Sequence, residues 1–343
     1  ATPKPTVAPT ATPKPTVAPT ATPKPSTPTP APSGAKLLFS TGFEGNVALN
    51  PVGECSAGSI ANCWQDIVGT DTTTGFSFPI NFWGGKSRIQ MINQQGTLTP
   101  ANADSLMKNA IQTATGHNGN QTKVLYQAFL FNNTTSSQNN FIYFPDREGG
   151  DLYFTYWMKL QPDIVSKLKS GTWFPLSEFK AGGGNFRMQT SLNGYDNNPG
   201  FSISCDAFSN GPLEPNNVTY WQYKPANKNL GWDPIWLQGS SYAKPPYFNT
   251  SLPPNISGNI IPIPTDWFKF EIFWHREANN NGRYWVAING KTLIDYHGDT
   301  KGDGKSIDRI FPWMNYTNAT APSSIMIDDV EFWDGFPSTA SPH

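Results

Sequence analysis

Residues 266–277 read DWFKFEIFWHRE, and RYWVAIN (283–289) and KTLIDYH (291–297) follow them. Apolar and polar residues alternate along each run, which is the period of a half-buried β-strand. Asn289-Gly290 separates the last two runs, and this dipeptide favours the type I′ turn of a two-residue hairpin. Three successive strands, two of them joined in a hairpin, indicate an antiparallel sheet in this part of the chain.

The same period recurs along most of the chain. It predicts strands at 36–44, 123–132, 151–160, 173–181, 185–193, 200–208, 266–277, 283–289, 291–297, 306–313 and 323–333. Helical patterns are confined to 105–113 and 162–168, and residues 46–122 and 209–265 carry no clear strand pattern. The predicted fold class is therefore all-β: a two-sheet antiparallel jelly-roll sandwich over residues 36–337, with 338–343 as a C-terminal tail.

Residues 1–35 form a different kind of segment, built from ATPKPTVAPT twice and the related ATPKPSTPTP. Proline at this density excludes helix and sheet interior, so we expect an extended polyproline-II-like stalk. At about 3.1 Å per residue it would reach roughly 100 Å. Threonine between prolines is typical of O-glycosylated stalks, which predicts an extracellular protein, secreted or held at a cell surface. The candidate O-glycosylation sites are Thr2, Thr6, Thr10, Thr12, Thr16, Thr20 and Thr22.

The composition narrows the classes of molecule that the protein could bind. Without the three lysines of the repeats, 21 Lys and Arg stand against 25 Asp and Glu, which argues against a nucleic-acid partner. No run approaches the ~18 apolar residues of a membrane span, so no membrane insertion is expected. Only 14% of residues are charged and 13% are aromatic. Aromatic rings and neutral hydrogen-bonding side chains are typical of proteins that handle polysaccharides.

The cysteines predict one disulfide. Cys55 and Cys63 lie eight residues apart in GECSAGSIANC, a spacing that allows a small closed loop. Cys205, the third cysteine, is expected to be a buried thiol in a strand.

A cluster of aromatic residues lies in the long stretch 209–265, which is also rich in proline. Loops of this length within a domain are usually functional. These aromatics could form a stacking platform for sugar rings, or instead a hydrophobic lid over one sheet. The candidate glycan-binding residues are Tyr220, Trp221, Tyr223, Trp232 and Trp236.

Four passages carry a resemblance to a known family. They are STGFEG (40–45), EFKAG (178–182), the hairpin NGRYWVAINGK (281–291) and IDDVEFW (327–333). Together they resemble the concanavalin A-like jelly-roll superfamily, which includes lectin-like, laminin-G-like and polysaccharide-lyase-like proteins. The resemblance implies a fold in which the first and last strands pair, and a function connected with glycans.

The resemblance also implies a structural metal. Some jelly-roll modules hold calcium between the first and last strands, and the matching positions here are Glu44, Asp328 and Asp329. Calcium takes six to eight oxygen ligands, so backbone carbonyls would have to complete the shell. The alternative is that these carboxylates cap strand ends in water.

Catalysis is weakly indicated. The Glu-x-Asp-x-x-Glu strand of a retaining glucanase is absent, and the four histidines show no zinc-binding spacing. Alginate-lyase-like enzymes combine Phe-Lys-Ala-Gly with a nearby Tyr-x-Gln and a Gln-x-His strand, and only the first motif is present. A lyase would therefore need substitutes, for which the candidates are Lys180, Arg187, Gln189 and His275.

The sequence leaves three functions open. The favoured one is a secreted, non-catalytic, lectin-like glycoprotein that binds a glycan or assembles with its own copies into a filament or matrix. The second is a lyase that acts on a uronic-acid polymer. The third is a carbohydrate-binding module of a larger polysaccharide-degrading enzyme. No catalytic residue is assigned in the first or third case.

Overall fold

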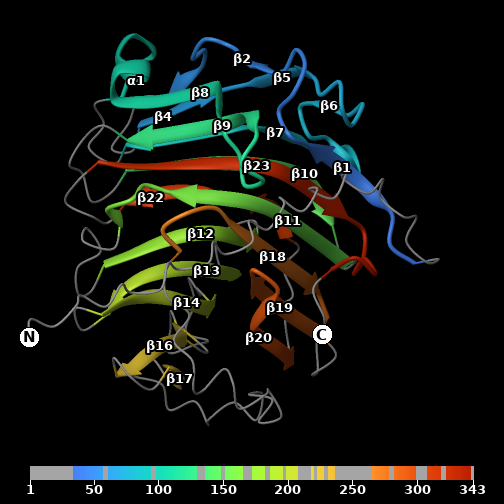
Figure 1. Cartoon of the computed structure of the whole chain (residues 1–343), viewed down its shortest axis with the longest axis vertical. Coiled ribbons are helices and arrows are strands. Elements are labelled where there is room, and N and C mark those ends of the chain that lie inside the picture. Colours follow the sequence, from blue (N-terminus) through green and yellow to red (C-terminus); the bar gives the residue numbers. More distant parts are fainter. Residues whose placement is uncertain are drawn as a thin grey trace, which may run out of the picture.

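A computed structural model shows an antiparallel β-sandwich with two large sheets stacked face to face (Figure 1). It describes residues 34–56, 61–93, 98–129, 136–147, 151–164, 172–181, 186–195, 198–207, 218–219, 222–227, 231–235, 264–277, 282–298, 307–317 and 322–340. The predicted all-β, two-sheet jelly-roll class is confirmed.

One layer is an eight-stranded sheet. Its order is β20 (Lys291–Gly298), β19 (Gly282–Ile288), β18 (Phe268–His275), β11 (Asp151–Leu160), β23 (Ser323–Trp333), β9 (Gln121–Phe129) and β8 (Met107–Thr115), and β1 (Leu37–Thr41) pairs with β23. The other layer is a ten-stranded sheet. Its order is β15 (Val218–Thr219), β14 (Asn198–Ala207), β13 (Phe186–Tyr195), β12 (Thr172–Ala181), β21 (Ile307–Phe311), β10 (Ser136–Arg147), β7 (Lys86–Asn93), β4 (Ala61–Gln65) and β3 (Cys55–Ser56), and β22 (Met314–Thr317) pairs with β10.

Smaller elements complete the fold. The hairpin β16 (Gln222–Asn227) and β17 (Gly231–Ile235) forms one small sheet, and β2 (Ala48–Leu49), β5 (Ile67–Thr70) and β6 (Ser77–Phe78) form another. A short 3₁₀ turn, η1, spans Phe82–Gly84, and the helix α1 spans Pro100–Leu106. In the part of the chain that the structure describes, no helix is long and apolar enough to cross a membrane.

Aromatic residues from both layers fill the space between the sheets. Phe179 of β12 packs against Trp274 of β18, with ring centroids 4.6 Å apart, and Tyr156 of β11 packs against Trp313 at 5.8 Å. All four side chains are almost completely buried. Burial of large apolar side chains is the main stabilising contribution to such a sandwich.

The strand predictions outside the two long unassigned stretches are confirmed. β11 and β23 occupy the predicted ranges 151–160 and 323–333, and the other predicted strands end within a few residues of the structural bounds. Asn289 and Gly290 have φ values of 50° and 74°, as a type I′ turn requires between β19 and β20.

The prediction of a helix at 105–113 is wrong. The helix α1 ends at Leu106, and β8 follows directly and pairs with β9 over its whole length. Helical spacing is present at Leu106, Met107, Ala110 and Ile111. The pairing of nine residues with β9 nevertheless stabilises the strand more than this local preference stabilises a helix. The predicted helix at 162–168 lies mostly outside the described residues.

The interpretation of 46–122 as a stretch without strands is also wrong, because β2 to β8 lie there. Within 209–265 the structure describes β15, β16 and β17. The pattern does not predict β10 either, because its first half is polar: Gln138, Asn139 and Asn140 are all buried amides, and Asn139 lies with Gln90 on the outer side of the sheet. A strand that buries amides lacks the apolar alternation that identifies a strand in a sequence.

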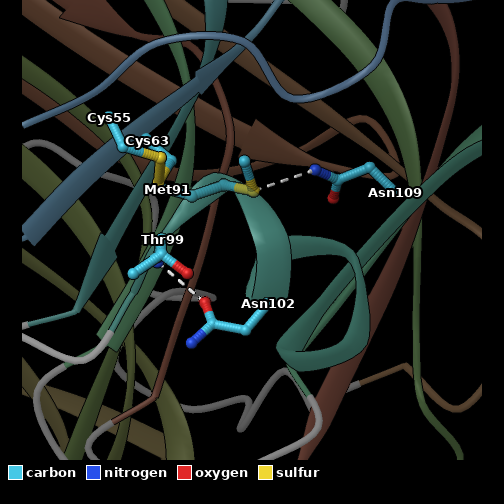
Figure 2. Close-up of a disulfide and its surroundings, with 6 residues drawn as sticks. All are labelled: Cys55, Cys63, Met91, Thr99, Asn102 and Asn109. Carbon is cyan, nitrogen blue, oxygen red and sulfur yellow. Dashed lines mark hydrogen bonds between the residues drawn. A yellow bond between two sulfur atoms is a disulfide. The ribbon is translucent and has the colours of Figure 1, made fainter.

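Cys55 and Cys63 form a disulfide between β3 and β4, where they are directly opposite each other (Figure 2). Cys63 is opposite Met91 of β7, and the Met91 sulfur accepts a hydrogen bond from Asn109 Nδ2 at 3.7 Å. The disulfide therefore links β3 to β4 at the edge of the ten-stranded sheet, close to the place where this sheet contacts β8. Nearby, the Asn102 side chain accepts a hydrogen bond from the backbone N–H of Thr99 at the start of α1.

β23 changes partner in its middle. Residues Ser323–Ile327 pair with β9, and Val330–Trp333 pair with β1. Asp328 and Asp329 lie between the two partners, and on the opposite side the pairing with β11 contains a register shift at this point. Asp329 has φ 43°, in the left-handed region that glycine usually occupies. The first and last strands thus pair, as the resemblance implies, and they do so beside an irregular point of the sheet.

Asp71 fixes the chain just after β1. One carboxylate oxygen accepts hydrogen bonds from Thr41 Oγ1 and the Gly42 N–H, both at 2.8 Å, and from the Glu44 N–H at 3.1 Å. The other oxygen accepts from two backbone N–H groups in the turn that follows Asp71. Burial alone would raise the pKa of Asp71, but these donors outweigh burial and lower the pKa below its ordinary value.

We predict that Asp71→Ala lowers the free energy of unfolding by about 3 kcal/mol at neutral pH, because several buried donors lose their acceptor. The folded-state pKa is lowered, so this stabilisation is complete above about pH 4 and is lost as the pH falls. Urea denaturation of both proteins at neutral and acidic pH measures the effect.

Asp104→Ala is the control, because Asp104 is exposed. Equal stability of the Asp71 and Asp104 variants would contradict this role of Asp71.

Candidate functional site

Three aromatic side chains lie on the outer face of the ten-stranded sheet: Trp64 of β4, and Phe141 and Tyr143 of β10. Ile142, between the last two, points into the core. The Phe141 ring packs edge-on to Trp64 at 5.3 Å and lies nearly parallel to Tyr143 at 6.4 Å. Tyr143 is 46% exposed, so these rings present apolar surface to the solvent.

Arg88 of β7 lies over the first of these rings, with its guanidinium carbon 4.7 Å from the Trp64 centroid. It also donates to Glu54 Oε2 at 3.0 Å. The Glu54 side chain is 74% exposed, and an ion pair of this kind contributes at most about 1 kcal/mol. A carboxylate from a ligand could therefore replace Glu54 at little cost.

Arg309 of β21 places a second guanidinium 5.9 Å from the Phe141 ring. Its Nε and Nη2 donate to the two oxygens of Asp308 at 2.6 and 2.7 Å. This bidentate pair is the main reason that the pKa of Arg309 is raised, and Tyr143 and Glu178 add to the effect. The surface formed by Trp64, Arg88, Phe141, Tyr143 and Arg309 is called the arginine–aromatic face below.

The backbone register extends this face towards two predicted lyase residues. Lys180 of β12 is opposite Arg309 on one side and Arg187 of β13 on the other. Arg309 is in turn opposite Tyr143. Directly opposed residues of antiparallel strands share a face, so these four positions form one row across four strands. Gln189 stands two residues further along β13, opposite Glu178, and the side chains of Lys180, Arg187 and Gln189 lie outside the described residues.

His275 does not join this row. It belongs to β18 in the eight-stranded sheet, where its Nδ1 contacts Asp151 Oδ1 and its position is opposite Arg283. Trp274 beside it points into the core, so His275 faces the outer side of the eight-stranded sheet. The structure brings Lys180, Arg187 and Gln189 to one sheet and places His275 in the other.

The predicted stacking platform is only partly described. Tyr223 and Trp232 lie in the hairpin β16–β17, opposite Pro234 and Pro225 respectively, and only their backbone is described. Tyr220, Trp221 and Trp236 lie outside the described residues.

Sequence reasoning missed the arginine–aromatic face. RIQM (88–91) alternates, so the outward position of Arg88 could be read from it, whereas FIYF (141–144) is apolar or aromatic throughout and gives no such signal. What could not be read is that β4, β7 and β10 are neighbours, since Trp64 and Phe141 are 77 residues apart.

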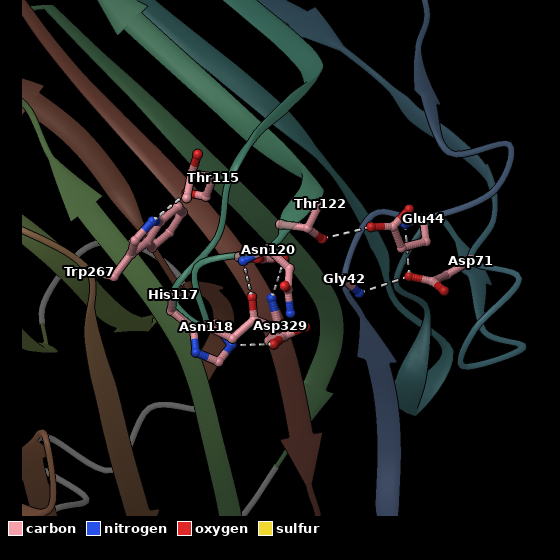
Figure 3. Close-up of polar contacts among 11 residues, drawn as sticks. Gly42, Glu44, Asp71, Thr115, His117, Asn118, Asn120, Thr122, Trp267 and Asp329 are labelled. Carbon is pink, nitrogen blue, oxygen red and sulfur yellow. Dashed lines mark hydrogen bonds and ion pairs between the residues drawn. The ribbon is translucent and has the colours of Figure 1, made fainter. Parts of the chain in front are cut away.

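Asp328 and Asp329, two of the acids that the resemblance assigns to calcium, lie where β23 changes partner. The third, Glu44, lies beyond Gly42 from Asp329 in the loop after β1 (Figure 3). A Cβ added to Gly42 would lie 3.0 Å from Asp329 Oδ1 and 3.7 Å from Asp328 Oδ1, so both carboxylates reach this glycine. Glu44 follows in the same loop, and its Oε1 accepts hydrogen bonds from Thr122 Oγ1 and the backbone N–H of Lys123.

A histidine from the β8–β9 turn adjoins this carboxylate cluster. His117 Nε2 lies 2.7 Å from Asp329 Oδ2. The imidazole stacks on Trp157 of β11, with the two rings 4.0 Å apart and only 3° from parallel. The turn is thereby held over the outer face of the eight-stranded sheet.

Asp328 is the buried member of the cluster, at 2% exposure. Burial raises the pKa of Asp328 to about 8, and the charges of Asp329, Glu44 and Asp71 add to this. In the described ranges no three His, Cys, Asp or Glu side chains are already arranged around one point as a metal site. The donors are nevertheless all oxygens, and crowded carboxylates beside a buried acid fit the chemistry of a calcium ion.

The fold defines the chain as an all-β antiparallel sandwich of the jelly-roll class. No family model and no curated protein sequence matches it. Among solved structures it is similar to alginate lyase Aly36B, with 14% identity over 72% of this chain and 93% of that one and a TM-score of 0.37.

Two further solved structures resemble the chain at similarly low sequence identity and TM-score. The endo-β-1,4-glucuronan lyase from the fungus Trichoderma reesei has 9% identity over 66% of this chain and 87% of that one, with a TM-score of 0.39. The cellulose-induced protein Cip1 has 13% identity over 66% and 85%, with a TM-score of 0.34. Similarity at this level assigns no activity, so the functional argument rests on the chain's own residues.

Proposed function

We propose that this protein is an extracellular, non-catalytic glycan-binding protein that recognises an acidic polysaccharide through the arginine–aromatic face. The observation that carries the proposal is the combination of three adjacent rings with two guanidinium groups on one outer sheet face. In a chain with only 14% charged residues, two arginines lying over aromatic rings are a specific arrangement.

Each part of this face matches one feature of an acidic sugar. The C–H-bearing face of a pyranose ring is apolar and stacks on aromatic rings such as Trp64 and Tyr143. The planar guanidinium of Arg88 can pair with a uronate carboxylate through two parallel hydrogen bonds in place of Glu54, and Arg309, whose Nε and Nη2 are paired with Asp308, offers its remaining N–H groups. A flat face that crosses several strands suits an extended polymer better than a small molecule.

The setting of the module is part of the proposal. A disulfide such as Cys55–Cys63 is typical of proteins in oxidising compartments, which supports secretion or display at a cell surface. The stalk, which lies outside the described residues, would carry O-linked sugars and hold the sandwich away from its attachment point. The same features suit a carbohydrate-binding module of a larger enzyme, or a subunit of an extracellular filament or matrix.

Replacement of the exposed aromatics tests the glycan-binding site. We predict that Trp64→Ala and Tyr143→Ala each weaken binding to a soluble polyuronate at least about tenfold, roughly 1.4 kcal/mol, because the ring contact is lost. Affinity gel electrophoresis and calorimetry measure this effect, with a neutral β-glucan as the comparison polymer.

Trp267→Ala is the matched control, because Trp267 is also partly exposed but adjoins the eight-stranded sheet. Unchanged binding in both face variants, or equal loss in the control, would remove the arginine–aromatic face from the proposal.

A second candidate function is a lyase, and the row Tyr143–Arg309–Lys180–Arg187 favours it. In β-elimination a base takes the proton on the carbon beside the uronate carboxylate, and a cation neutralises that carboxylate. The bond from the neighbouring carbon to the glycosidic oxygen breaks, the oxygen takes up a proton, and a carbon–carbon double bond remains. Lysine, arginine and tyrosine supply the three required kinds of group.

If the protein is a lyase, polyuronates will give products that absorb in the ultraviolet. Lys180→Ala and Arg187→Ala should then abolish the activity, while His275→Ala should leave most of it, because His275 belongs to the other sheet. Activity that depends on His275 and not on Lys180 would exclude the row as the active site. No ultraviolet-absorbing product from any polyuronate would leave the non-catalytic function.

We also propose a structural calcium ion held by Glu44, Asp328 and Asp329 together with backbone carbonyls. A bound cation would offset the repulsion among these acids and tie β1 to β23. Calcium added after chelation should raise the thermal unfolding midpoint of the wild-type protein by a few degrees, because it binds only the folded state.

The rise should disappear in Asp328→Asn and persist in the exposed control Asp104→Asn. A wild-type midpoint that does not respond to calcium would refute the metal site.

A further inference from the structure

The sequence of the stalk offers few bonds to proteases that cleave after lysine or arginine. Residues 1–35 contain no arginine and three lysines, each followed by proline: Lys4-Pro5, Lys14-Pro15 and Lys24-Pro25. Proline has no N–H and its ring crowds the peptide nitrogen, so a bond before proline is a poor substrate for a trypsin-like enzyme. Lys36, which is followed by Leu37, is the first lysine of the chain without this protection.

Lys36 lies at the junction of the stalk and the sandwich. The residue is exposed, and β1 begins at the next residue, Leu37. Exposed positions at the end of a domain are common sites of proteolysis. A cut between Lys36 and Leu37 would remove the stalk and leave every strand of the sandwich whole.

The backbone of Lys36 is held by the residue that follows β23. The Lys36 N–H donates to Asp334 Oδ1 at 2.5 Å, and the Lys36 C=O accepts from the Asp334 N–H at 3.0 Å. A serine protease attacks the carbonyl of the residue that it recognises, here Lys36. Because Asp334 occupies both backbone groups of Lys36, the bond is protected until this contact opens.

Asp334 belongs to a segment that packs across the outside of the sandwich, residues 334–340, called the C-terminal clasp below. The clasp touches the junction a second time at its next residue. A Cβ added to Gly335 would lie 3.4 Å from the Cβ of Ala35, so the two backbones meet closely here. Opening the Lys36 contact therefore requires the start of the clasp to move.

One aromatic side chain anchors the clasp. Phe336 packs against three buried rings on the outer face of the eight-stranded sheet, at centroid distances of 5.4, 5.0 and 5.0 Å: Tyr153, Phe273 and Trp285. The guanidinium carbon of Arg283 lies 5.6 Å from the centroid of the Phe336 ring. Lifting the clasp exposes these rings, which favours the closed state. It breaks none of the strand pairs between β11, β18 and β19, so opening is local and does not require unfolding.

We propose that the Lys36–Leu37 bond is a gated release site, where a trypsin-like protease separates the sandwich from its stalk once the C-terminal clasp has lifted. The protease is a separate protein, and water is the co-reactant. The C–N bond breaks, the oxygen of water joins the Lys36 carbonyl carbon to give a carboxylate, and the Leu37 nitrogen becomes the new amino terminus. The proton lost by the acid passes to that nitrogen or to solvent.

The released product is the whole sandwich, including the arginine–aromatic face. Release therefore does not depend on which polymer this face binds, and failure of the glycan-binding proposal would leave the release site untouched.

Trypsin digestion of the folded, full-length protein tests the site. The stalk should leave through one cut, giving a product that begins at Leu37, which mass spectrometry of the intact fragment identifies. Lys36→Gln removes the recognised side chain at an exposed position and should prevent this release. A stalk that stays attached to the wild-type protein, or that leaves the Lys36→Gln variant at the same rate, would overturn the proposal.

The role of the clasp is tested with Phe336→Ala, which removes its anchor. Release should become at least about tenfold faster, because cleavage of a protected bond follows the population of the open form. Asp334→Ala, which leaves the aromatic packing in place, should act in the same direction. Circular dichroism establishes that both variants are folded.

Met107→Ala is the matched control for a general loss of stability. Met107 is completely buried, but it belongs to β8 at an edge of the eight-stranded sheet and does not contact the clasp cluster. Its release rate should equal that of the wild type. Equal rates for Phe336→Ala and the wild type, or the same acceleration in Met107→Ala, would show that the clasp does not gate the bond.

Discussion

The eight-stranded sheet depends on the pairing of β23 with three other strands. This last strand of the chain lies in the middle of the sheet, with β11 along one side and β9 and then β1 along the other. The sheet is therefore incomplete until both ends of the domain have met. Asp71 supports the meeting point by holding the backbone that leaves β1. The carboxylate cluster lies at the same point, where Asp328 and Asp329 have no paired strand residue on the side of β9 and β1.

A buried polar network links this sheet to the other one. Trp313 Nε1 donates to Gln127 Oε1 at 3.0 Å, and Ser323 Oγ donates to Asn315 Oδ1 at 2.7 Å. Asn315 in turn donates to the carbonyl of Gln127 and lies beside Gln138. Such networks set the relative position of strands, since a shift of one residue would leave amides unpaired in the core. They also explain why polar sequence can form central strands here.

The two outer faces of the sandwich differ in what covers them. The outer face of β11, β18 and β19 is covered by the C-terminal segment, where Phe336 packs 5.0 Å from both Phe273 and Trp285. Of the predicted C-terminal tail 338–343, Ala340 packs against the same cluster. The ten-stranded sheet instead leaves Tyr143 exposed and Arg88 and Arg309 partly exposed. Within the described residues, the arginine–aromatic face therefore lies on the opposite side of the sandwich from His275.

The sequence by itself determined the class of fold, because alternation is a local property: runs such as 151–160 and 323–333 and the Asn289-Gly290 turn can be recognised without their neighbours. It also offered Lys180, Arg187, Gln189 and His275 as lyase candidates, which stays a prediction, and it gave no indication of Arg309. Only the tertiary structure decided that residues 107–115 form a strand and that polar β10 lies inside the sheet. It alone decided that Trp64 meets Phe141 and that His275 stands apart. Those outcomes depend on which strands pair, and pairing is set by contacts between residues far apart in the chain, which no local pattern encodes.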